Sequence, residues 1–433
     1  MISASQHHQK KIDLRLVLVF FVAASVGLAM AWVSIAKFAL FIFVLLMLIW
    51  QFLKRPNFNS DETQAIPKNT ARAVTVCLLA FSLSLFWTTA DSSESLGALG
   101  KYGKLLTLLL LPMLLRSKQE VVQAVTVFVV FQAFLAISSW LLFFGVPIPW
   151  ASSKRALAEF SVYSTYLDQS IMSAVTAALC WHLRNIAPTR YGKQTAVAIA
   201  LICISNVLFA LIGRTGHLVA IVILSLAIMW ELPRRYRWLL LVLPAILLIA
   251  AYTLSAKVQM RVTLVQTEVQ AFSFKKGQSV DTGTSTGIRL HFWHRAAQSM
   301  AQSPWLGSGV GSWSNEYNRL EKQLSPGGML LGERSNPHQE YLLWGVQLGA
   351  LGVLLFTGLL LSILRDCWQA EVQARRAGVS VLTALAVSSL FNSTIYDALI
   401  GDFFCVALGL MLALSVHRTP QELPENHPAL KVA

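Results

Sequence analysis

The polar and apolar residues of this chain are arranged in long blocks. Uncharged apolar runs recur between short polar segments, and most have the length of a helix that crosses about 30 Å of hydrocarbon. Because the runs are continuously apolar, they predict helices and not the alternating strands of a membrane barrel. The expected spans are residues 14–32, 34–53, 73–90, 104–116, 121–145, 168–183, 194–213, 217–232, 238–255, 341–364, 379–396 and 401–416.

This pattern predicts an all-α polytopic membrane protein with about twelve transmembrane helices. The fourth run is short, so we expect that segment to be tilted, interfacial or broken. Four regions are expected: an N-terminal bundle of about nine transmembrane helices, one large and partly helical loop, the C-terminal transmembrane helices and a tail. Their boundaries are residues 1–255, 256–340, 341–416 and 417–433.

The distribution of charge predicts the orientation in the membrane. Charged residues make up only 13% of the chain, about half of the share in a soluble domain. Basic residues gather in every second loop, as in loops that stay in the cytoplasm. We therefore expect both termini in the cytoplasm and residues 256–340 on the external face. The net charge of +14 follows from this bias and does not indicate a nucleic-acid partner.

The long external loop contains most of the residues that suggest chemistry. Over residues 256–337 it has nine Lys and Arg against five Asp and Glu. Long loops are usually functional or disordered, and three tryptophans with a helical pattern near 287–302 favour an ordered domain. The Gly-Ser-Gly-Val-Gly segment at 307–311 resembles a phosphate loop. It is better explained as a turn, because no strand precedes it and no lysine follows.

Arg214 is a candidate binding residue, because it lies between two apolar runs at the external end of the seventh span. A charged residue at membrane depth is costly and is functional by default, although its side chain can also extend to the interface. The flanking Gly213 and Gly216 would let a phosphate approach the backbone.

The loop offers two further arginines. Arg289 and Trp293 share one helix face in Gly-Ile-Arg-Leu-His-Phe-Trp-His-Arg, and Arg295 ends that segment. Planar guanidinium groups suit phosphate oxygens through paired hydrogen bonds. The alternative for any one of these cations is a solvated surface or contact with anionic lipid headgroups.

His338 is the strongest candidate for chemistry, since it lies where the polar loop meets an apolar helix. Pro337 is expected to set the start of that helix, and a helix N-terminus attracts anions. Arg334, Glu340 and Tyr341 are close in sequence. Asp397 precedes the last span and would orient His338, pair with an arginine or cap the final helix. Downstream glycines, at positions 345, 349 and 352, predict a smooth face for close helix packing.

These residues together resemble a known family. His338-Gln339, nine further residues and Gly349-Ala350-Leu351-Gly352 match the pattern His-[Asn/Ser/Gln]-x9-Gly-x-x-Gly. The pattern is similar to that of bacterial O-antigen ligases, in a group that also contains O-antigen polymerases and O-linked protein oligosaccharyltransferases. The likeness extends to the twelve spans, the late external loop and three sequence features: Arg214 after the seventh span, Arg289-x-x-x-Trp293, and residues 304–309.

The resemblance implies a membrane glycosyltransferase of GT-C-like architecture in the bacterial inner membrane, with its site at the periplasmic face. The donor would be an O-antigen glycan on undecaprenyl pyrophosphate, and the acceptor would be a sugar hydroxyl of lipid A–core. His338 would be the general base, and Arg214, Arg289 and Arg295 would bind the pyrophosphate. Supporting positions would be Trp293, Tyr341 and Asp397.

No cofactor or metal is expected. The chain lacks an Asp-x-Asp pair for a divalent cation, a Walker loop for ATP and a Gly-x-Ser-x-Gly hydrolase motif. Two alternatives of the same class stay open, an O-antigen polymerase and a protein oligosaccharyltransferase. A transporter or flippase for an anionic solute is an alternative of a different class, although transporters place charges or broken helices near the midplane.

Overall fold

The computed structural model describes residues 13–54, 66–151, 158–187, 189–254, 256–271, 285–324, 330 and 336–417, and this part of the chain contains helices and no strand. Arg334 lies outside the described residues, as does most of the C-terminal tail. The first helices are α1 (Leu14–Ser25), α2 (Met30–Lys54), α3 (Lys68–Leu83), α4 (Ser92–Tyr102), α5 (Thr107–Leu114), α6 (Lys118–Phe143), α8 (Tyr166–Leu183) and α9 (Arg190–Ser205). The chain continues with α10 (Arg214–Glu231), α11 (Leu243–Leu254), α12 (Ala256–Ala271), α13 (Ser285–Gln302), α14 (Trp313–Leu324), α15 (Glu340–Trp368), α16 (Val372–Ser388) and α17 (Ala398–Val416).

Each expected span overlaps a helix of the structure, although α3 and α16 end at Leu83 and Ser388, before the predicted ends at 90 and 396. The all-α polytopic class is confirmed. Within the described ranges, seven helices are long and apolar enough to cross a membrane, so the count of twelve stays a prediction. Three helices were not predicted: α4, α12 and α14. They are polar, and α14 shows its helical period only in one buried face formed by Trp313, Tyr317 and Leu320.

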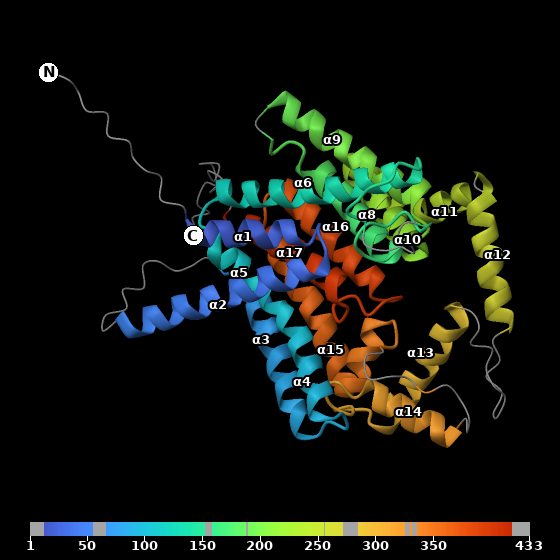
Figure 1. Cartoon of the computed structure of the whole chain (residues 1–433). Helices are drawn as coiled ribbons and strands as arrows, with labels where there is room; N and C mark the ends of the chain where they lie inside the picture. Colours follow the sequence, from blue (N-terminus) through green and yellow to red (C-terminus); the bar gives the residue numbers. More distant parts are fainter. Residues whose placement is uncertain are drawn as a thin grey trace, which may run out of the picture.

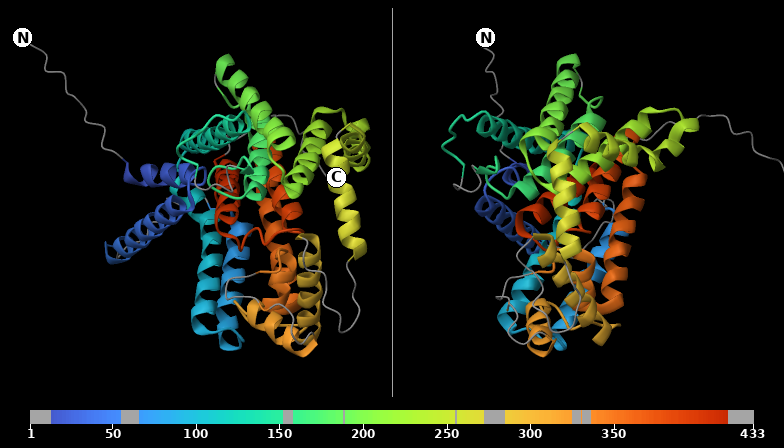
Figure 2. Two further views of the ribbon diagram at one scale, coloured as in Figure 1. Left: turned by 45° about the vertical axis from the view of Figure 1, so that its right-hand side comes forward. Right: turned by 90° about the vertical axis from the view of Figure 1, so that its right-hand side faces the viewer.

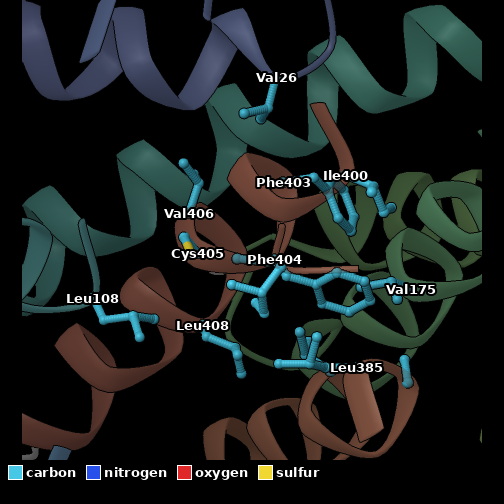
Figure 3. Close-up of a cluster of buried hydrophobic side chains, with 14 of the residues drawn as sticks. Val26, Leu108, Val175, Leu385, Ile400, Phe403, Phe404, Cys405, Val406 and Leu408 are labelled. Carbon is cyan, nitrogen blue, oxygen red and sulfur yellow. The ribbon is translucent and has the colours of Figure 1, made fainter. Parts of the chain in front are cut away.

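The final helix, α17, forms the centre of the molecule (Figures 1 and 2). Nearly all its residues are buried, because α5, α6, α8, α15 and α16 all contact it. Figure 3 shows Phe404 of α17 beside Val175 of α8, and Phe403 packs against Phe128 of α6 with ring centroids 5.4 Å apart. A helix that is apolar on all sides is buried in this way.

Ion pairs join segments that the charge pattern assigns to the same face. Arg15, at the start of the first span, lies 2.8 Å from Glu120, which follows the fourth span. Lys118 and Glu371 are 2.7 Å apart, and Arg184 and Glu231 are 2.9 Å apart. All these residues belong to loops or helix ends that the sequence predicts to be cytoplasmic. The contacts therefore agree with the predicted alternation.

The segment that is predicted to be external, which includes α13 and α14, is attached to the helical bundle. Helices α13 and α14 lie at one end of the molecule, beside α15 and the ends of α3 and α4 (Figure 1). Backbone and side-chain hydrogen bonds fix this arrangement: the amide of Thr89 donates to Ser308 at 2.9 Å, and the hydroxyl of Thr88 donates to the carbonyl of Val310 at 2.7 Å. Residues 304–312 therefore serve as a connector between the external helices and the bundle.

Helix α15 is broken at Gly349, which has φ 64° and ψ −151°. This conformation is accessible almost only to glycine. The sequence prediction of one smooth packing face is therefore wrong at this position. Gly345 does serve close packing, since a Cβ there would lie 2.5 Å from Sδ of Met300 on α13.

Residues 304–309 fill the break in α15. The amides of Ser308 and Gly309 each donate at 2.8 Å to the carbonyls of Val346 and Gln347, respectively. On the other side of the break, the amide of Ala350 donates to the carbonyl of Pro304 at 2.7 Å. Buried backbone groups need such partners, so the glycine-rich segment is more than the turn that was expected: it completes the hydrogen bonding of an interrupted helix.

Candidate functional site

His338 lies in the short segment between the external helices and α15, and its backbone is held in an unusual conformation. Its φ is +52°, in the left-handed region that residues other than glycine rarely adopt. The Asn336 side chain accepts from the amide of His338 at 2.9 Å, which closes a local turn. The imidazole stacks on the ring of Phe292, with centroids 6.2 Å apart and planes 18° from parallel. These contacts together determine the direction of the ring.

Helix α13 supplies a second restraint on this segment. The indole N–H of Trp293 donates to the carbonyl of Pro337 at 3.0 Å. Because Phe292 and Trp293 are neighbours on one helix, the histidine ring and the backbone before it are held by the same element. Trp293 therefore lies next to His338, and its supporting role stays a prediction.

Arg214 and Arg289 come together although 75 positions separate them in the sequence. Arg214 is the first residue of α10, and its guanidinium donates to Thr286 at 3.2 Å. Thr286 is one helical turn before Arg289 on α13. Burial, and then the charge of Arg214, lowers the pKa of Arg289. The two positive charges repel each other, and a bound anion would offset that repulsion.

The positive charge of this arginine pair also affects His338. Burial, and after it the charge of Arg289, lowers the pKa of His338 to about 4. The imidazole is therefore neutral at pH 7 and can accept a proton. Arg214 thus acts electrostatically on Arg289, and Arg289 acts on His338, although the three residues were predicted from separate parts of the sequence. All three side chains are half-buried.

The position of Arg214 depends on a close contact between α10 and α8. A Cβ at Gly213 or Gly216 would overlap the hydroxyl of Ser170. The two glycines therefore make room for α8, whereas the sequence suggested that they make room for a phosphate. Tyr166, the first residue of α8, interacts with the charge of Arg289, so the same contact also places α8 at the site.

Asp397 occupies the N-cap position of α17, but its side chain makes no capping hydrogen bond. Instead, Oδ1 accepts from the Asn336 amide at 2.9 Å. Asn336 thus bridges Asp397 and the backbone of His338, which favours the orienting role over the capping role. Burial raises the pKa of Asp397 to about 6, while the ammonium groups of Lys104 and Lys101 oppose that rise.

Two of the predicted residues are placed elsewhere. Arg295 is buried between α13 and α14, where it donates to Glu321, which also pairs with His291 at 2.9 Å. Its position six residues after Arg289 puts it on another face of α13, so we do not include it in the site. Tyr341 packs edge-on against Phe356 and donates weakly to the carbonyl of Ala386 at 3.4 Å, within the helical bundle.

Sequence reasoning missed Asn336 and Glu340 as structural supports of the site. Glu340 is fully buried, and its carboxylate accepts from the amides of Ile395 and Tyr396 at 2.9 and 3.2 Å. It thereby fixes the turn that precedes Asp397 to the start of α15. The available signal was the Asn-Pro-His segment, because an asparagine two residues before an unusual turn often bonds to its backbone.

These features define the class of the protein, which is a multi-pass helical membrane protein. Its candidate site lies beside α13 and near the N-terminal ends of α8, α10, α15 and α17. Residues 199–357 match the family model described as O-Antigen ligase, so this part of the chain is a domain of the O-antigen ligase family. The match includes Arg214, Arg289 and His338 and ends before Asp397. It supports a glycosyltransferase-like enzyme of the ligase or polymerase type, with lipid-linked glycan substrates. A search of the curated proteins finds no match.

Proposed function

We propose that this protein is an O-antigen ligase, which transfers an O-antigen glycan from undecaprenyl pyrophosphate to a sugar hydroxyl of lipid A–core at the periplasmic face of the inner membrane. The observation that carries the proposal is the convergence of Arg214, Arg289 and His338. The family match supports the same class of reaction.

The arginine pair is the proposed binding site for the donor. As the bond between C1 of the sugar and the phosphate oxygen breaks, its electron pair stays on the pyrophosphate, whose negative charge grows. Fixed cations aimed at this charge stabilise the transition state more than the ground state. Arg214 and Arg289 present two planar donors of this kind, and pyrophosphate is a good leaving group without a general acid.

His338 is the proposed general base. It takes the proton of the acceptor hydroxyl while the hydroxyl oxygen forms the new bond to C1. A single displacement of this kind inverts the anomeric centre and needs no metal ion. In the free protein burial, and after it the charge of Arg289, lowers the pKa of His338. A bound diphosphate would neutralise that guanidinium, so the imidazole would become a stronger base once the donor is present.

The supporting residues hold this arrangement without contacting the reacting atoms. Trp293 and Asn336 bond to the backbone around His338, and Asp397 bonds to Asn336. A catalytic base must be within hydrogen-bond reach of its proton, and a misplacement of about 1 Å can lower a rate by about a hundredfold. We therefore assign these three residues to the orientation of His338.

A ligation assay tests the proposal. Purified protein is mixed with undecaprenyl pyrophosphate-linked glycan and lipid A–core, in EDTA and without ATP. We expect lipopolysaccharide of higher mass, a rate lower by about 10²–10⁴ for His338→Ala and by about 10²–10³ for Arg214→Ala. Arg319→Gln is the control, because Arg319 is on α14 and pairs with Glu316 at 2.6 Å. Near-normal product from folded His338→Ala or Arg214→Ala would contradict the assigned roles.

The same assay separates the alternatives. Growth of the lipid-linked glycan, with lipid A–core unchanged, would identify a polymerase. Transfer to a protein hydroxyl would identify a protein oligosaccharyltransferase. Movement of the glycan across a vesicle membrane without any covalent change would identify a transporter and overturn the proposal.

A further inference from the structure

A buried lysine lies behind the candidate site. Lys104, in the short 3-10 helix Gly103–Leu106 before α5, is only 3% exposed. Its ammonium donates to the carbonyl oxygens of Asp397 and Ala398 at 2.6 and 3.3 Å. Gly401 makes room for it, because a Cβ at that position would lie 2.7 Å from Nζ. The contact therefore connects the start of α5 to the start of α17.

A buried ammonium is costly in the membrane and requires an explanation. A second lysine at the same end, Lys37, forms an ion pair with Asp402 at 2.7 Å. Lys104 also interacts electrostatically with Asp402, but its hydrogen bonds are to the turn before α17. Both lysines thus interact with the Asp402 carboxylate, but Lys104 is the more deeply buried of the two and, unlike Lys37, donates to the Asp397 backbone.

Hydrogen bonds continue from Lys104 to His338. The Lys104 ammonium holds the Asp397 backbone, the Asp397 carboxylate holds the side chain of Asn336, and Asn336 holds the amide of His338. The last two bonds are each 2.9 Å long. Since His338 has an unfavourable backbone conformation, its direction depends on restraints of this kind.

We propose that Lys104 is a positioning residue for the reaction proposed above: it fixes the turn before α17 and, through Asp397 and Asn336, the direction of His338. The proposal rests on the proposed function for its kinetic consequence, but its structural part does not. Lys104 touches neither substrate nor reacting atoms.

The electrostatic consequence concerns Asp397. Burial raises the pKa of Asp397, and Lys104 followed by Lys101 opposes the rise. Without the Lys104 ammonium, the pKa of Asp397 would rise further, and the carboxylate would be lost at a higher pH. The acid limb of the pH–rate profile would then move upward. Other titratable groups that interact with Asp397 are Asp168 on α8, Glu340 on α15 and the neighbouring Tyr396.

Kinetics of Lys104→Met test the proposal. We expect kcat to fall by about 10- to 100-fold, the KM for the donor to stay nearly unchanged, and the acid limb to move to higher pH. Lys104→Gln keeps a hydrogen-bond donor but loses the charge. It should therefore have a higher kcat than Lys104→Met, while the acid limb of its pH–rate profile should stay at the higher pH. The matched control is Lys37→Met, which removes the other lysine that interacts with Asp402 and should leave the acid limb in place. A folded Lys104→Met protein with wild-type kcat and acid limb would overturn the proposal.

A measurement without substrates separates this proposal from the proposed function. The rate at which diethyl pyrocarbonate modifies His338 reports the exposure and protonation of the imidazole. We expect it to change several-fold in Lys104→Gln and to stay unchanged in Lys37→Met. If the wild type makes no lipopolysaccharide product but this difference is seen, the ligase assignment fails and the positioning role stands. An unchanged rate in Lys104→Gln, with active wild type, would remove the positioning role alone.

Discussion

At the scale of single residues, the site is defined by charges placed close to one another. Arg289 affects the pKa of His338, and Arg214 affects the pKa of Arg289. A neutral histidine beside a cation is a weak base until an anion reduces the effect of that cation. In the proposed mechanism, binding of the donor would therefore be coupled to the basicity of His338 through Arg289.

This coupling gives a prediction for Arg289→Gln. Removing the guanidinium removes a charge that lowers the pKa of His338, so that pKa should rise from about 4 toward the ordinary value, while burial still keeps it below. The pH dependence of His338 modification by diethyl pyrocarbonate measures the change. Saturation with the lipid-linked donor should move the wild type in the same direction. A pKa of His338 that is unaffected by both treatments would show that Arg289 and the histidine are not coupled.

The sequence allowed Arg214 and His338 to be chosen because each interrupts an apolar context. It did not allow Arg289 to be separated from Arg295, which has the same chemistry and lies in the same predicted helix. Only the fold shows that Glu321, 26 residues later, pairs with Arg295. The sequence left the role of Asp397 open among orienting His338, pairing with an arginine and capping a helix, since its partner Asn336 is 61 positions away.

At the scale of helices, the break in α15 is the main departure from the predicted pattern. The glycines at 345, 349 and 352 have a spacing that fits a smooth helix face as well as a break. Periodicity describes one helix at a time, whereas the break exists because residues 304–309 supply its hydrogen-bond partners. The break also differs from that of a transporter, since protein backbone fills it.

Gly349→Ala should destabilise the protein. The side chain would be forced into a backbone conformation that costs about 1–3 kcal/mol, and its Cβ would overlap the backbone of Trp305. Gly358→Ala on the same helix is the control, because a Cβ there meets nothing within 4 Å and alanine favours helices. Thermal unfolding in detergent measures both. Equal unfolding temperatures for the two variants would show that the break is not required.

At the scale of the whole molecule, the charge pattern and the contacts agree. The sequence predicted which loops share a face from their basic residues alone, and the ion pairs of Arg15, Lys118 and Arg184 connect loops of one predicted face. Which helices are neighbours could not be predicted, because every apolar run looks alike. The central position of α17 follows from packing with several partners at once.

The orientation can be tested with single cysteines. Tyr191, which is 81% exposed, belongs to a predicted cytoplasmic helix end, and the exposed Lys322 belongs to the external helix α14. The native cysteines are all buried and should react little. In spheroplasts, a membrane-impermeant maleimide should label Lys322→Cys readily and Tyr191→Cys only after the membrane is opened. The reverse result would invert the proposed topology and move the site to the cytoplasmic face.

The filled break in α15 has a consequence for biosynthesis. Residues 304–309 are synthesised before the helix that they complete, and the charge pattern predicts that they lie on the side of the membrane opposite the ribosome. The first half of α15 therefore has no finished set of backbone partners until the preceding loop has been translocated. Because that half begins beside His338, we expect the candidate site to assemble only after export of the loop, and a protein whose loop is not exported should lack the proposed activity.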